Sequence, residues 1–347
     1  MSSTARSAPD GTRDRGAVLV WVALMMTVLL GVGAIVIDIG ALYAEKRQLQ
    51  NGADAAALAV AQDCANGDDC GPYGTTASQY ADLNAKDSAS EVDVVCGVGP
   101  GLPDCSDPPP AGASNATGWV RVRTSTETPD GGNEVDFVLG PIMGSLAGET
   151  VNAAAVAAYG AQGSGAFVPF VFSVCEYIEL GGSLDALTFP DGIGYIYYHG
   201  QNRNDPNAGN CRPSPSGQDL PGGFGRVNSI SCVANLSQGQ WIPEDPGNDL
   251  SRGCPYASWQ NQDVVVALYD QVRGTGRNGE YHIVGFVGMQ LLGYRLGGNK
   301  TFATASCPLV GNSSLSYFCG KFTKVSTNSG DFGAGPNYGA NIIKMVG

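Results

Sequence analysis

An uninterrupted apolar run near the N-terminus constrains this chain more than any other feature. Residues 17–37 carry no charged side chain, and a helix of that length, rising ~1.5 Å per residue, spans roughly 30 Å, the thickness of the hydrocarbon core of a bilayer. A cleaved signal peptide usually has a shorter apolar region that ends in an A-x-A-like site, whereas Asp38-Ile39-Gly40 follows here. The sequence therefore predicts a retained transmembrane helix over 16–37, preceded by a cytoplasmic tail over 1–15.

Flanking charges and cysteines predict the orientation of this helix. Three arginines precede the run and Lys46 and Arg47 follow it, which is a slight excess of positive charge on the N-terminal side. All ten cysteines lie beyond the run, and an even number in a membrane-tethered chain is typical of disulfides formed in an oxidising compartment. We expect a single-pass protein of the cell membrane with a cytoplasmic N terminus and extracytoplasmic C-terminal domains.

The helical pattern continues beyond the membrane run. Apolar residues recur at spacings of three, four and seven between 42 and 60, which is typical of an amphipathic helix. Asn51-Gly52 weakens the middle of this segment, but its alanine-rich second half has high helix propensity. We expect an amphipathic stalk helix over 38–63, and its apolar stripe packs either against neighbouring helices or against its own outer domain.

Composition excludes several classes of function. The net charge is −13, which argues against nucleic-acid binding. With 50 glycines and only 15% charged residues, the chain is expected to be rich in strands, turns and long loops, while 43% hydrophobic residues suffice for one or two buried cores. The sequence contains two histidines, His199 and His282. A metal or catalytic site that depends on histidine could therefore form only around one of these two residues.

The outer part divides at a Gly/Ser-rich link over 160–165. Alternating apolar residues at 119–124 and 134–139 are typical of half-buried strands, and in this context residues 151–159 are expected to form another. Beyond the link, stretches rich in β-branched and aromatic residues occur at 167–174, 194–198, 264–268 and 281–290. We expect an α+β fold, with a small α+β module over 64–160 and a disulfide-stapled, mainly antiparallel β domain over 161–347.

All ten cysteines are disulfide candidates. Short sequence separation favours three local pairs: Cys64 with Cys70, Cys96 with Cys105, and Cys307 with Cys319. The six cysteines of the C-terminal domain allow fifteen connectivities, and the sequence does not choose among the rest, which are Cys175, Cys211, Cys232 and Cys254.

Motifs that suggest chemistry have simpler interpretations. Residues 274–279 match G-x-G-x-x-G, but a strand is expected on both sides, which favours a hairpin over a dinucleotide site. No G-x-S-x-G sequence occurs. The oxygen-rich segments 202–210 and 244–249 lack EF-hand spacing and are typical of turns, with calcium binding as the alternative. We therefore expect no enzymatic activity, no catalytic residue, no cofactor and no metal site.

Four short motifs share one order in the first 62 residues. They are Asp14-Arg15-Gly16, the apolar run, Asp38-Ile39-Gly40 and the sequence LQNGADAAALA over 49–59. In this order they resemble the N-terminal module of TadE/TadG-like proteins of tight-adherence (Tad, Flp) pilus assembly. Segments 222–225, 278–286 and 318–322 are similar to the C-terminal region of actinobacterial TadG-like members.

The resemblance implies a function and partners. It implies a non-enzymatic minor pilin or accessory protein whose transmembrane helix extends into a pilin-like stalk. Its expected partners are other Tad pilins or pseudopilins, the inner-membrane assembly platform and membrane lipid, while any small-molecule ligand of the C-terminal domain stays unknown. At the membrane boundary, Asp38 either pairs with a basic group of a partner or is solvated, and the family pattern favours the partner contact.

Two departures narrow the resemblance. Pseudopilin members are cut after a glycine and have a glutamate five residues later, whereas Trp21 stands at that distance from Gly16. Processing after Gly16 is therefore disfavoured, which favours the uncleaved, TadG-like type. Larger TadG-like members carry a von Willebrand A domain with a D-x-S-x-S metal site, and residues 87–90 have the wrong spacing for it.

Two other functions stay open. One is a membrane-anchored adhesin or ligand-binding module. If exposed, several aromatic residues of the C-terminal domain could bind a ligand: Tyr195, Tyr197, Tyr198, Trp241 and Trp259. The same residues can instead form the core. A cell-envelope hydrolase would have to recruit His199 or His282, neither of which belongs to a recognisable catalytic signature.

Overall fold

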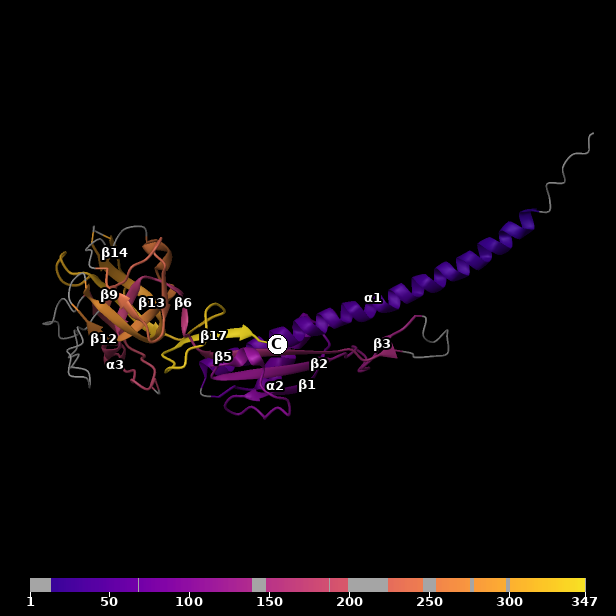
Figure 1. Ribbon diagram of the computed structural model, residues 1–347, viewed down its shortest axis with the longest axis horizontal. Coiled ribbons are helices and arrows are strands. Elements are labelled where there is room, and N and C mark those ends of the chain that lie inside the picture. Colours follow the sequence, from indigo (N-terminus) through magenta and orange to yellow (C-terminus); the bar gives the residue numbers. More distant parts are fainter. Residues whose placement is uncertain are drawn as a thin grey trace, which may run out of the picture.

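A long helix and two β units make up the computed structural model. It describes residues 14–67, 69–138, 148–186, 188–198, 224–245, 254–274, 278–297 and 300–346. Figure 1 shows the helix projecting from a small sheet, with the second β unit at the other end of the molecule. The fold is α+β, as predicted, with one long apolar helix followed by mostly antiparallel sheets.

Helix α1 (Asp14–Asn66) runs without a break through the expected weak point at Asn51-Gly52. Gly52 is buried, and a Cβ there would lie 3.2 Å from the backbone oxygen of Ala81 in α2 (Tyr73–Asn84). The glycine therefore lets the two helices approach closely, which compensates for its low helix propensity.

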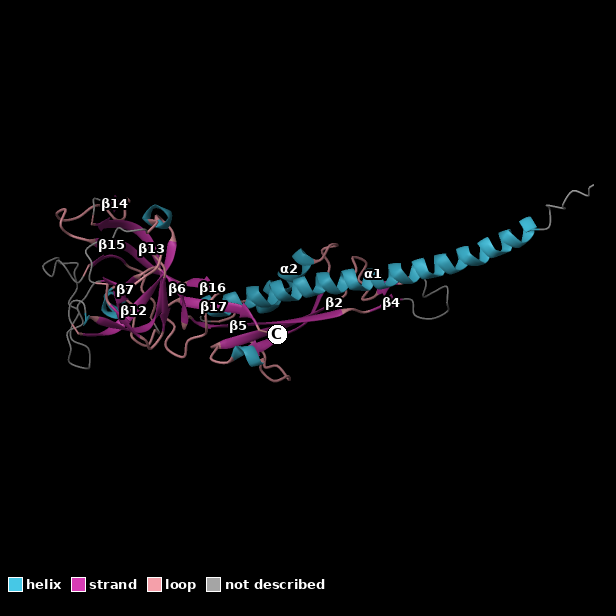
Figure 2. Cartoon of the chain, turned by 45° about the horizontal axis from the view of Figure 1, so that its top comes forward, coloured by secondary structure: helices cyan, strands magenta, loops and turns pink. Residues whose placement is uncertain are grey.

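The C-terminal half of α1 packs on a five-stranded sheet. Its strands, in spatial order, are β1 (Glu91–Val98), β2 (Gly118–Ser125), β5 (Asn152–Ala161), β17 (Ala340–Met345) and β16 (Val325–Thr327). All neighbours are antiparallel except β16 and β17. The strands predicted at 119–124 and 151–159 are confirmed as β2 and β5. Figure 2 shows α1 lying along this sheet.

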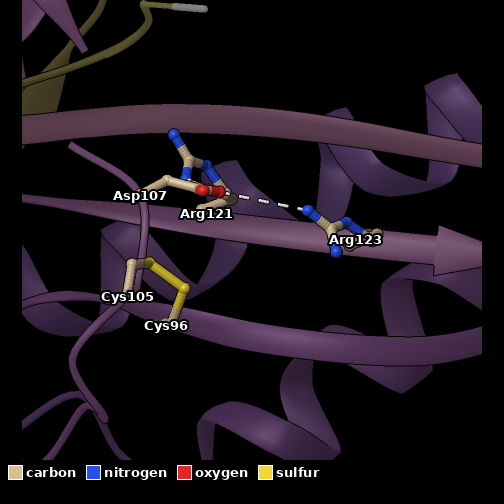
Figure 3. Close-up of polar contacts among 5 residues, drawn as sticks. All are labelled: Cys96, Cys105, Asp107, Arg121 and Arg123. Carbon is tan, nitrogen blue, oxygen red and sulfur yellow. Dashed lines mark hydrogen bonds and ion pairs between the residues drawn. A yellow bond between two sulfur atoms is a disulfide. The ribbon is translucent and has the colours of Figure 1, made fainter. Parts of the chain in front are cut away.

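The loop between β1 and β2 is held against β2. It contains the one-turn helix η1 (Ala111–Ala113), and the Cys96–Cys105 disulfide ties its start to β1. One carboxylate oxygen of Asp107 lies 2.6 Å from the guanidinium of Arg121 and 4.0 Å from that of Arg123 (Figure 3). A covalent link and an ion pair thus order a proline-rich segment that has little apolar surface of its own.

The second β unit is an eight-stranded sheet with an aromatic core. Its main path is β8 (Ile193–Tyr197), β15 (Tyr317–Thr323), β13 (Glu280–Leu296), β12 (Asp263–Arg273), β7 (Phe170–Ser173) and β9 (Phe224–Arg226). Strands β11 (Trp241–Pro243) and β14 (Lys300–Phe302) also pair with β13. A parallel bridge from Tyr198 to Phe224 joins the two ends of the path, so the sheet closes on itself around the core.

Short elements complete the second unit. Strands β6 (Ser164–Phe167) and β10 (Ala234–Ser237) form a separate pair, and η3 (Tyr256–Trp259) packs at the core. The single strand expected over 167–174 is divided, because Pro169 separates β6 from β7 and Ser173 caps helix α3 (Val174–Glu179) by accepting a hydrogen bond from the Cys175 N–H at 3.2 Å.

The end of the chain returns to the first sheet and to α1. Strand β17 lies between β5 and β16, so the expected domain over 161–347 contributes its last strands to the sheet of the expected module over 64–160. The buried Asn341 donates from Nδ2 to the backbone oxygen of Ala65, 3.1 Å away, and Lys324 donates to that of Asn66, 2.8 Å away. These bonds satisfy carbonyls that the helix end leaves without intrahelical partners.

Buried phenols make the second β unit sensitive to alkali. Burial raises the pKa of Tyr177, Tyr269 and Tyr281 far above the ordinary value, and that of Tyr338 to about 12. Tyrosines in the unfolded chain have a pKa of ~10. Above that pH the free energy of unfolding therefore falls, by about 1.4 kcal/mol per pH unit for each phenol that stays protonated in the folded protein. We expect these phenols to ionise together with unfolding, measured as tyrosinate absorbance and circular dichroism on one pH series. Their ionisation in a folded protein near pH 10 would contradict this.

Candidate assembly interface

The N-terminal half of α1 is an apolar surface that the described residues of this chain leave uncovered. From 18 to 37 nearly every position is exposed, including Leu29 and Leu30 at 70% each, and Figure 1 shows this half projecting beyond the sheet. Among the described residues, α1 is the one helix long and apolar enough to cross a membrane, with a mean hydropathy of 2.6 in its most apolar part. At ~1.5 Å per residue the bare half is roughly 30 Å long.

Among the described residues, hydrogen bonds between α1 and the rest of the chain begin at Asp38. A two-stranded ribbon, β3 (Val135–Asp136) with β4 (Gly148–Glu149), extends from the sheet along the helix. Immediately beyond β3, the N–H of Val138 donates to Oδ1 of Asp38 at 2.8 Å. The structure thus places Asp38, which the sequence singles out, at the border between bare and covered helix.

Polar contacts then follow along the covered helix. Lys46 donates to the backbone oxygen of Asn152, and Gln50 donates to that of Ala154 at 3.0 Å. Burial raises the pKa of Glu45, and the nearby carboxylate of Asp87 raises it further. These side chains fix the rotation of α1 against the edge of the module.

Tyr43 and Arg47 form a pair on the helix just beyond the border. The Arg47 guanidinium lies 4.5 Å from the centre of the Tyr43 ring and donates to its hydroxyl at 2.9 Å. Tyr43 is 59% exposed. Tyrosine and arginine next to an apolar run are typical of a membrane–water interface, because each combines an apolar stem with a polar end.

The apolar stripe of α1 packs against the outer domain of the same chain. Five of its residues are at most 2% exposed: Leu49, Ala53, Ala56, Ala57 and Val60. They share one core with α2 and with small residues of the sheet, including Ala153, Ala155 and Ala157. Small side chains on both surfaces bring helix and sheet close together. Of the two alternatives for this stripe, the structure shows the intrachain one.

This close packing predicts a large difference between two alanines of α1. Ala57→Leu inserts three heavy atoms into a fully packed contact and is expected to destabilise the module by about 1–3 kcal/mol. Ala59→Leu adds the same atoms at a half-buried position of the same helix and is expected to stay within about 0.5 kcal/mol of wild type. Urea unfolding of both variants measures the difference. Equal destabilisation would contradict the packing described here.

The structure assigns most of the candidate cysteines to disulfides. The bonded pairs are Cys64–Cys70, Cys96–Cys105, Cys232–Cys254 and Cys307–Cys319. Three of them are the local pairs expected from sequence separation. Cys175 is also disulfide-bonded, while Cys211 lies outside the described residues, as do His199 and the segment 202–210. Gly16 lies in the first turn of α1.

The motifs with suggested chemistry are structural where the chain is described. Strands β12 and β13 form an antiparallel hairpin across 274–279, with Arg273 opposite Glu280, as expected. Asp245 pairs with Arg226. Residues 246–249, the rest of the oxygen-rich segment at 244–249, lie outside the described chain. Among the described residues, no group of three or more His, Cys, Asp or Glu side chains is arranged to hold a metal ion.

Most of the aromatic residues considered for ligand binding are buried or make contacts within the chain. Tyr197 and Tyr198 are buried, and Trp259 meets the core ring of Phe170 at 6.2 Å. Tyr195 donates its hydroxyl to the backbone oxygen of Pro308 at 2.6 Å.

Trp241 is half-buried on the sheet surface, between two polar side chains. Its ring lies 5.2 Å from that of His282 and 4.2 Å from the guanidinium of Arg273. Nδ1 of His282 in turn lies 2.6 Å from Oδ1 of Asp270. Trp241 thus belongs to a network of side chains within the same chain.

The comparisons agree with the part of the chain that the geometry singles out. No curated protein and no solved structure matches the chain. A family of known sequences matches a segment that begins two residues after the start of α1 and ends three residues before its last one. It therefore contains the bare apolar half, Asp38 and the buried stripe. Over residues 16–63 the chain matches the family described as "Putative Flp pilus-assembly TadE/G-like", and this similarity of α1 supports a component associated with a Tad pilus.

Proposed function

We propose that this protein is a non-enzymatic, membrane-anchored, TadG-like component of a Tad/Flp pilus assembly or secretion apparatus. The observation that carries the proposal is the division of α1 within the matched segment. Its first half is bare and apolar, and its second half is docked on the sheet of its own chain. Such a helix anchors a domain and at the same time offers a surface for neighbouring helices.

The apolar segment and the disulfides support one orientation of the chain in the membrane. The bare half is long enough for one crossing of a bilayer, and the disulfides lie entirely on its C-terminal side, where an oxidising compartment maintains them. The N terminus is then cytoplasmic, and both β units are exposed outside the cell. The absence of a glutamate five residues after Gly16 favours a helix that is retained uncleaved.

The proposed partners are pilins or pseudopilins and the inner-membrane assembly platform. In a bilayer, helices associate through close van der Waals packing rather than through the hydrophobic effect, and nearly all positions of 18–37 are exposed to such packing in the described structure. The contact between Asp38 and a basic group of a partner stays a prediction, because Asp38 here accepts a bond from Val138.

The test is a pull-down of the tagged full-length protein from its native membrane in mild detergent, followed by mass spectrometry of its partners and of its own N terminus. We expect recovery of pilins or the assembly platform, with residues 1–16 still attached. The matched control replaces 18–37 by a leucine/alanine run of equal length, which keeps the anchor and removes its specific side chains. That variant is expected to stay in the membrane and to lose the pilus components.

Two results would overturn the proposal. One is recovery of the same proteins by the wild type and by the leucine/alanine control. The other is normal piliation of cells that lack the protein, since an assembly component is required for the pilus or its stability.

A further inference from the structure

Val138, the last described residue after β3, lies at the level where the bare helix begins. Val138 is bonded through its N–H to Asp38, and its own side chain is 57% exposed. Ile39 on the helix is 61% exposed. Two apolar side chains, which are 99 residues apart in sequence, thus lie unburied at the same height along α1.

The charged residues of the ribbon lie on or beside its two strands. Glu134, Asp136 and Glu149 are exposed, but the sequence from 137 to 147 carries no charged residue. A soluble protein usually places charges at the end of an exposed hairpin, because water solvates them. On the β3 side the last charge is Asp136, two residues before the one that is bonded to Asp38.

Distances along the ribbon fit the dimensions of a bilayer surface. Asp136 precedes Val138 by two residues, or about 7 Å at ~3.3 Å per residue. The interfacial layer on each side of a bilayer is roughly 5–8 Å thick. If the apolar run fills the hydrocarbon core up to Asp38, Val138 lies at the boundary of that core and Asp136 lies at the outer edge of the headgroups. Tyr43 and Arg47 then lie at headgroup height as well.

We propose that the two residues directly after β3, Phe137 and Val138, form a second membrane contact that rests in the lipid interface beside α1. The occupant of this surface is lipid of the same bilayer, because the surface is continuous with the bare helix and is bordered by Tyr43 and Arg47. The proposal rests on the membrane anchoring proposed above. Its consequence is that the module is fixed to the bilayer at two points, so the bond between Asp38 and Val138 sets the depth and rotation of α1.

The experiment places a photo-reactive p-benzoylphenylalanine at one position at a time in the full-length protein. Val138 is the test position, and its bond to Asp38 uses only backbone atoms of residue 138, so the contact persists. Leu29 reports on the anchor itself. Ile230, which is 84% exposed on the distant β unit, is the matched apolar control. Each protein is reconstituted in phosphatidylcholine/phosphatidylglycerol vesicles and irradiated, and its peptides are analysed by mass spectrometry.

The expected result is a lipid adduct at 29 and at 138 and none at 230. A lipid adduct at 29 with none at 138 overturns the second contact and leaves the anchor intact. A protein–protein crosslink at 138, in place of the lipid adduct, also overturns it, because a second copy then covers the ribbon. Absence of an adduct at 29 contradicts the anchor, and with it the basis for a membrane contact at 138.

Discussion

Replacing both Met25 and Leu29 by arginine is expected to release the protein from the membrane. The two residues lie one helical turn apart near the middle of the apolar run and are 60% and 70% exposed, so neither substitution disturbs intrachain packing. An arginine at the centre of a spanning helix costs about 2.5–3.5 kcal/mol on insertion scales. Two together cost roughly 5–7 kcal/mol, which shifts a partition equilibrium by more than a thousandfold. Extraction of membranes at alkaline pH measures the released fraction.

A matched pair on another helix controls for added charge. Tyr80 and Leu83 are exposed apolar residues of α2, one turn apart on the covered part of the molecule. The same double replacement by arginine there is expected to leave the protein in the membrane pellet. Retention of the Met25/Leu29 variant in the pellet as firmly as this control would refute the assignment of 18–37 as the anchor.

Phe318→Ala is expected to unfold most of the second β unit near physiological temperature. Phe318 is 3% exposed on β15, and its ring lies 4.7 Å from that of Phe224 and 4.9 Å from that of Phe170. These rings come from three strands, including β9 at the closure of the sheet. Truncation of such a residue costs about 3–5 kcal/mol through lost burial and the cavity that remains, a large share of a typical stability of ~5–15 kcal/mol.

Leu309→Ala is the control for this truncation. Leu309 belongs to the same unit but is 45% exposed, so its replacement is expected to change stability by less than about 0.5 kcal/mol. Near-ultraviolet circular dichroism during thermal unfolding reports on both variants, since the core is aromatic. Equal unfolding temperatures for the Phe318 and Leu309 variants would show that Phe318 does not organise the core.

Features encoded by neighbouring residues were predictable from the sequence. The apolar run, the helical period up to residue 62 and the alternation in β2 are local patterns, and the structure contains the corresponding elements. The hairpin across 274–279 follows from two adjacent strand-like segments. The local disulfides could also be proposed, because a short separation limits the choice of partner.

Long-range contacts were not predictable. Nothing near residue 341 indicates that β17 inserts beside β5, and no pattern pairs Asp38 with Val138, because each contact depends on the path of the chain between them. Gly52 illustrates the same limit: locally it weakens a helix, and only the position of α2 explains it. Val138 was missed as a candidate. The signal that could have singled it out is the charge-free stretch over 137–147.

The placement of β17 has a consequence for biogenesis. Residues 341–345 complete a sheet whose other main strands, β1, β2 and β5, end by residue 161, and the intervening residues include the whole second β unit. In the orientation proposed above, vectorial export leaves the N-terminal unit with one edge of β5 unpaired until almost the entire chain has crossed the membrane. A nascent or prematurely terminated protein thus displays an open edge that chaperones and proteases can recognise, which couples maturation of the first sheet to completion of the polypeptide.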